Sequence, residues 1–144
     1  MKVEIFALCD FAQADATGKL NILGVFDRIF GRQAPITHPL CALAIKMRFD
    51  KIEEGQKRAR LSFIDTDGNS VMPTMEPHIQ VVVPPHETTA TGQIVVIIQQ
   101  LKLPNFGEYS IDLAIDGRQE ASIPLIACQI PQPPQTQLPP AQSA

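Results

Sequence analysis

Apolar and polar residues alternate with a period of two along most of this chain. In residues 109–115, one face carries Tyr109, Ile111, Leu113 and Ile115, and the other face carries small or polar side chains. Such alternation is typical of a β-strand with one buried face. Residues 40–49 and 57–65 repeat the pattern, which predicts these core side chains: Cys41, Leu43, Ile45, Met47, Phe49, Ala59, Leu61 and Phe63.

Turn-forming residues separate eight segments of this kind, at residues 3–11, 20–26, 40–49, 57–65, 79–83, 94–101, 109–115 and 121–128. Asp116-Gly117 predicts a type I′ hairpin, because this turn needs a positive φ at both central residues. Prolines are spread along the chain, and no segment keeps a helical period. The sequence therefore predicts an all-β fold, a single antiparallel β-sandwich of about eight strands with an Ig-like or C2-like appearance.

Length and composition suit one globular unit. The chain has 144 residues, of which 44% are hydrophobic and 19% are charged. We expect the sandwich domain to span residues 1–130 and residues 131–144 to form an extended, Pro/Gln-rich tail. The tail is interpreted either as a disordered end or as a docking peptide for a proline-binding groove. A net charge of −3 makes nucleic acid an unlikely class of partner.

The cysteines and the N-terminal segment predict a cytoplasmic protein. Cys9, Cys41 and Cys128 form no CxxC pair, which favours reduced and buried thiols. Cys9 shares the predicted inward parity of Val3 and Phe11, so a structural thiol is expected there. Residues 1–9 are too short and too polar for a signal peptide, and no apolar run approaches about 18 residues, so no membrane partner is expected.

Residues 94–98 are apolar at every position and uncharged. An exposed edge strand of this kind would aggregate, so we expect a central strand. Its second face then requires cover, either from a long loop at residues 30–40 or from a second subunit. A closed homodimer is the expected arrangement.

A cluster of basic residues is the strongest candidate for a binding surface. Strand parity places Lys46, Arg48, Arg58 and Arg60 as cross-strand neighbours on the outward face of one hairpin. Like charges in such positions suit an anionic or protein partner. The alternative is a solvated face that protects a sheet edge. No tryptophan is present and no aromatic residues lie among these cations, so base stacking is not expected.

A second candidate resembles a calcium loop. Asp65, Asp67, Asn69 and Glu76 occupy the first, third, fifth and twelfth positions of such a loop, and oxygen ligands at these positions suit Ca²⁺. Ser70 stands where the loop needs glycine, and the flanking segments predict strands. The alternative is a plain hairpin turn in which Asp and Asn side chains bond to the local backbone.

Motifs for catalysis are missing from the sequence. It contains neither Gly-x-Ser-x-Gly nor a glycine-rich phosphate loop. The remaining enzymatic alternative is a loop-assembled site around His38, His78 or His86, which would have to converge in the fold. No catalytic residue and no cofactor are predicted.

Two parts of the chain resemble a family of small uncharacterised bacterial proteins, a domain of unknown function. One part joins residues 8–12 to residues 18–29, which begin Gly-Lys-Leu-Asn, and the other joins residues 103–111 to residues 115–118. The resemblance covers residues 2–130 and implies an all-β fold, but it carries over no functional residue.

The leading hypothesis is a non-enzymatic binding or assembly module that associates with itself. The alternatives are an anion- or metal-binding sandwich and the enzyme described above.

Overall fold

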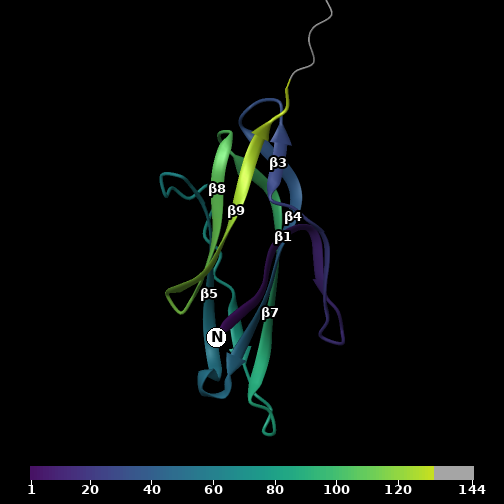
Figure 1. The fold of residues 1–144 in the computed structure, drawn as a ribbon, viewed down its shortest axis with the longest axis vertical. Helices are drawn as coiled ribbons and strands as arrows, with labels where there is room; N and C mark the ends of the chain where they lie inside the picture. The colour runs from purple at the N-terminus through teal and green to yellow at the C-terminus, as the bar shows by residue number, and fades with distance from the viewer. Residues whose placement is uncertain (132–144) are drawn as a thin grey trace, which may run out of the picture.

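The computed structural model describes residues 1–131, which form nine strands and one short 3₁₀ turn in two sheets (Figure 1). Sheet A has the strand order β2-β1-β4-β7 and consists of β1 (Lys2–Ala14), β2 (Leu20–Val25), β4 (Ile36–Asp50) and β7 (Thr89–Leu103). Sheet B has the order β3-β9-β8-β5-β6 and consists of β3 (Arg28–Gly31), β5 (Gly55–Asp65), β6 (His78–Val81), β8 (Gly107–Ile115) and β9 (Arg118–Gln129). The predicted all-β fold is confirmed. The predicted tail lies outside the described residues, apart from Pro131.

One hydrophobic core joins the two sheets. The core faces predicted for residues 40–49, 57–65 and 109–115 are confirmed, because their apolar side chains are all buried in that core. The Asp116-Gly117 turn is also confirmed, with φ values of 49° and 82° at its two central residues. β3 was not predicted, and it pairs with β9 in parallel, so the expected purely antiparallel pairing is wrong at this edge.

β7 lies at the edge of sheet A, so the expectation of a central strand for residues 94–98 is wrong. Its ladder with β4 runs from Ile36 opposite Leu103 to Asp50 opposite Thr89. The expected long loop at residues 30–40 is also wrong, because most of this segment belongs to β3 and β4. Alternation within a strand reports which side chains are buried but does not report how many neighbours the strand has.

The outer face of β7 is partly covered by a hairpin of the same chain. Beyond Cys9, β1 continues into a hairpin with β2, and Figure 1 shows this hairpin on the side of β4 and β7 that faces away from sheet B. Gly18 lies at the tip of the hairpin, and its carbonyl oxygen accepts a hydrogen bond of 3.0 Å from the side-chain amide of Gln93 on β7. A second, small cluster lies under the hairpin and consists of Cys9, Ala12, Leu20, Ile22, Ala42, Ala44 and Val95. Small alanine side chains on β4 allow this close approach.

Cys9 is buried, as predicted, but on the opposite face of β1 from the one expected. A bulge lies between Val3 and Ile5, and beyond it Phe6 and Leu8 face the core of the two sheets. Cys9 therefore lies on the outer face of sheet A, where its thiol donates to the Ala42 carbonyl oxygen at 3.4 Å. The bulge and the covering hairpin together overturn the parity expected from the sequence.

Candidate functional site

The predicted basic hairpin does not exist. β4 and β5 belong to different sheets, and the 3₁₀ turn η1 (Lys51–Glu53) carries the chain from one sheet to the other. Lys46 and Arg48 lie on the outer side of sheet A, and Arg58 and Arg60 lie on the outer side of sheet B. The prediction of four cross-strand neighbours is wrong because a sheet-crossing turn of three or four residues resembles a hairpin loop in sequence.

Internal contacts use part of this positive charge. Arg48 donates through Nε to Glu4 Oε1 at 2.8 Å and through Nη1 to Thr89 Oγ1 at 3.0 Å. Lys57 Nζ lies 3.7 Å from Asp116 Oδ2. These ion pairs link β4 to β1 and β5 to the turn between β8 and β9.

The Asp65 loop has the geometry of the plain turn described as the alternative. Asp65 Oδ1 accepts hydrogen bonds from the backbone N–H groups of Asp67 and Asn69, each at 2.9 Å. Glu76 follows Met75, which pairs with Leu61, four residues before Asp65 on β5. The structure therefore does not bring the fourth proposed ligand to the turn. Among residues 1–131, no three His, Cys, Asp or Glu side chains are grouped as metal ligands.

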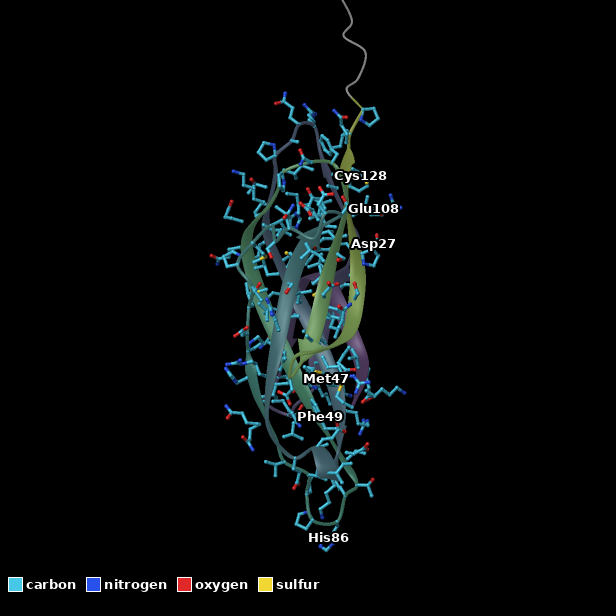
Figure 2. All side chains as sticks on the ribbon, turned by 90° about the vertical axis from the view of Figure 1, so that its left-hand side faces the viewer. Asp27, Met47, Phe49, His86, Glu108 and Cys128 are labelled. Carbon is cyan, nitrogen blue, oxygen red and sulfur yellow. The ribbon has the colours of Figure 1, made fainter. Side chains whose placement is uncertain are left out.

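The three histidines occupy different places. The His38 ring packs on Phe26 with 5.4 Å between centroids, near the end of the β4–β7 ladder where Ile36 opposes Leu103. His78 lies on β6 opposite Arg58, and His86 lies in the loop at the far end of the molecule (Figure 2). Nothing in this placement forms an acid–base pair.

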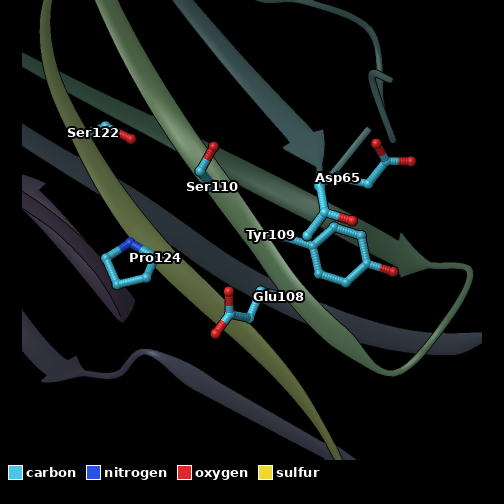
Figure 3. Close-up of a pocket in the computed structure, with 7 residues that line it drawn as sticks. Asp65, Glu108, Tyr109, Ser110, Ser122 and Pro124 are labelled. Atoms are coloured by element: carbon cyan, nitrogen blue, oxygen red, sulfur yellow. The ribbon is translucent and has the colours of Figure 1, made fainter. Parts of the chain in front are cut away.

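An open hollow of about 330 Å³ lies over β5, β8 and β9 (Figure 3). Two of its hydroxyl groups already have partners: the Tyr109 hydroxyl donates to the Asn105 carbonyl oxygen at 2.7 Å, and the Ser122 hydroxyl donates to Asp112 at 2.6 Å. Figure 3 shows the Glu108 carboxylate directed away from Asp65. The hollow therefore contains one hydroxyl–carboxylate pair, Ser122 with Asp112, and its lining residues include no histidine to act as a general base.

Two of the thiols are held in their protonated form. Desolvation by burial raises the pKa of Cys9, and it raises the pKa of Cys41 to about 11. A thiolate is the nucleophilic form of cysteine, so neither residue is suited to covalent catalysis at neutral pH.

Exposed apolar side chains gather on the sheet A side of the molecule. On the covering hairpin, Phe11 (48% exposed) lies opposite Leu23 (67% exposed), and Val25 follows on β2 at 66% exposed. Leu40 on β4 and Ile97 on β7 are each 48% exposed. The sequence reasoning missed the hairpin residues, although an available signal was that residues 20–26 carry apolar side chains on both faces.

A second open hollow, also of about 330 Å³, adjoins this apolar surface. It lies between the first half of β1 and the middle of β9 and is lined mainly by apolar groups: Phe6, Ala7, Leu8, Val25, Phe26, Asp27, Ile123 and Pro124. Apolar lining with a single carboxylate suits contact with another apolar surface more than it suits a small polar substrate.

Comparison with known proteins gives one match. Residues 4–127 match a family model described as "Family of unknown function (DUF6941)". No curated protein and no solved structure matches the chain. Within residues 1–131, no helix is long and apolar enough to cross a membrane.

Proposed function

Since the chain belongs to DUF6941, a family of unknown function, we propose its role from its own surfaces: it is a non-enzymatic binding or assembly module that associates with a second copy of itself. The proposal places the association on the sheet A side. The finer expectations, an Ig-like or C2-like sandwich from a bacterial cytoplasm, belong to the same proposal.

One observation carries this proposal, the apolar surface on the sheet A side. Phe11, Leu23, Val25, Leu40 and Ile97 are all large, apolar and at least 48% exposed. Monomeric proteins rarely expose a large contiguous apolar area, and larger patches mark interaction sites. Five such residues on two adjoining strand layers therefore favour association with another protein surface.

The polar surfaces support a role without catalysis. In the hollow of Figure 3, the Tyr109 and Ser122 hydroxyls are engaged in internal hydrogen bonds. The Asp65 carboxylate accepts two backbone hydrogen bonds within its own turn. No specific observation favours the anion-binding, metal-binding or enzymatic alternatives over the assembly role.

The test is the mass of the purified full chain in solution. Light scattering over a dilution series at micromolar concentration is expected to give a mass near twice 15.8 kDa. A closed two-fold dimer gives no higher oligomer as the concentration rises, because both copies use the same surface. A constant mass of 15.8 kDa throughout the series would contradict self-association.

A further inference from the structure

β7 presents a long strand edge without the usual protection. Within residues 1–131, β7 pairs only with β4, and no backbone hydrogen bond joins its other edge to another segment. No charged residue and no proline occurs from Thr89 to Leu101. Proteins normally protect such edges with lysine, proline, bulges or a covering segment, because free N–H and C=O groups accept a further strand.

The other edge strands, β2, β3 and β6, are only four to six residues long, and short edges are themselves a form of protection. Along β5, the Leu61 N–H donates to the Met75 carbonyl oxygen at 2.8 Å and Met75 donates back at 3.0 Å, so the segment that contains Met75 covers this edge. The part of β9 that β3 does not pair with, residues 118–125, carries Pro124 together with Arg118 and Glu120. On β7, a charge appears only at Lys102, beyond Gln100, whose φ is 55°. Among residues 1–131, β7 is therefore the longest edge strand, with 15 residues, and its central part carries neither a charge nor a proline.

The order of side chains along β7 is close to symmetric about Val96. Residues 93–99 are Gln-Ile-Val-Val-Ile-Ile-Gln, so each residue on one side of Val96 has a counterpart of the same kind on the other. An antiparallel two-fold pair with Val96 at its centre places Ile94 opposite the partner's Ile98 and Val95 opposite the partner's Ile97. It also places Gln93 opposite the partner's Gln99. Directly opposite residues share a face, so like meets like on both faces of the sheet.

Neighbouring registers lack this match. A shift of one residue places Gln93 opposite the partner's Ile98, or Ile94 opposite the partner's Gln99. Either shift sets an amide against an aliphatic side chain, and register follows the apolar pattern of the pairing strands. The uncharged edge also avoids like-charge repulsion at the two-fold axis, where each side chain meets its own copy.

We propose that β7 is the assembly edge, and that two copies of this chain pair antiparallel through residues 93–99 about a two-fold axis at Val96. The occupant of the edge is thus a second β7, and sheet A continues as one sheet of eight strands across the dimer. This inference rests on the proposed self-association and gives it a geometry. It also accounts for the exposure of Ile97, which gains the partner's Val95 as its neighbour.

Cysteine cross-linking tests the register. In a Cys128→Ser background, Gln93→Cys and Gln99→Cys are made as separate proteins, mixed and oxidised. The mixed sample is expected to give a disulfide-linked dimer on non-reducing gels. Each variant alone is expected to give none, because two copies of position 93 lie about 20 Å apart in this register, beyond the Cα separation that a disulfide spans. Cross-linking within a single variant, or none in the mixture, would overturn the register.

A matched pair of lysine substitutions tests the edge. Ile97→Lys and Phe30→Lys each place a charge at an exposed apolar position of an edge strand, with exposures of 48% and 60%, but Phe30 lies on β3 of sheet B. Ile97→Lys is expected to give a monomer with an unchanged circular dichroism spectrum, and Phe30→Lys a dimer. A dimeric Ile97→Lys protein would overturn the edge and leave the proposed function standing. A monomeric wild-type protein would overturn both.

Discussion

The outer face of sheet B is polar and solvated, whereas the outer face of sheet A is partly covered by the β1–β2 hairpin. On sheet B, the outward side chains include Arg60, Ser62 and Asp112 on neighbouring strands. Sheet A has Ala42 and Ala44 at corresponding places on β4, and both are fully buried under the β1–β2 hairpin. Antiparallel sheets commonly leave one face solvated, and sheet B does so. Small apolar residues at outward positions therefore mark a strand whose outer face packs against another segment of the chain.

The largest expected effect on stability comes from a charge placed under the β1–β2 hairpin. Ala42→Glu puts a carboxylate at a fully buried position of the outer face of sheet A, between Cys9 on β1 and Ile97 on β7. An unpaired buried charge is among the most damaging substitutions, so we expect a loss of about 3 kcal/mol or more in the free energy of unfolding. Chemical denaturation measures the loss.

The matched change on sheet B is Ala114→Glu. Ala114 also lies on an outer face, half-buried and directly opposite Arg60. A solvated glutamate beside an arginine is expected to change the free energy of unfolding by no more than about 0.5 kcal/mol. Equal losses in the free energy of unfolding of the two variants would contradict the view that one outer face is covered and the other solvated.

A smaller effect on stability is expected when a side chain of the β1–β2 hairpin is truncated. Ile22 packs toward Ala42 and Ala44, whereas its neighbour Leu23 points to solvent at 67% exposure. We expect Ile22→Ala to cost about 2 kcal/mol, near the lower end for truncation of a large aliphatic side chain because Ile22 is only partly buried. Leu23→Ala is expected to stay within about 0.5 kcal/mol of the wild type.

Thiol labelling gives an independent measurement on the Ile22→Ala protein. Cys9 lies under the hairpin, and Cys41 lies in the core between the sheets. If the hairpin opens locally, Ile22→Ala should accelerate labelling of Cys9 about 30-fold, since each 1.4 kcal/mol corresponds to a factor of ten and the expected loss is about 2 kcal/mol, and should leave Cys41 protected. Acceleration of both thiols to the same extent would indicate global unfolding instead.

The smallest expected effect concerns the turn at the tip of the hairpin. Asp15 accepts hydrogen bonds from the Thr17 hydroxyl and from the Lys19 N–H, and these bonds lower the pKa of its carboxyl group. A lowered folded-state pKa adds stability that is fully present above the unfolded value near 3.8 and is lost as the pH falls through the folded value.

Comparison of the wild type with Asp15→Ala isolates this contribution. The difference in free energy of unfolding between the two proteins should be constant from pH 7 to pH 5 and should shrink below pH 4. Glu53, whose pKa is also lowered, titrates in both proteins and cancels in the difference. A difference that does not depend on pH would show that the Asp15 charge has no part in holding the turn.

Some features of this protein follow from short stretches of sequence. The core faces of β4, β5 and β8 were predicted residue by residue, because alternation between water and core is a property of each strand alone. The Asp116-Gly117 turn and the backbone-bonded Asp65 turn were predicted for the same reason, since both depend on the conformations of a few adjacent residues.

Other features were decided only when distant parts of the chain met. The path of η1 placed Lys46 and Arg58 on different sheets, and the strand order placed β7 at an edge. The β1 bulge and the β1–β2 hairpin turned Cys9 away from the main core and left Leu23 exposed. Alternation specifies that a face is covered but not which segment covers it. The candidate assembly edge and its apolar surroundings were therefore settled by tertiary packing, because strand neighbours and covering segments come from residues far apart in the chain.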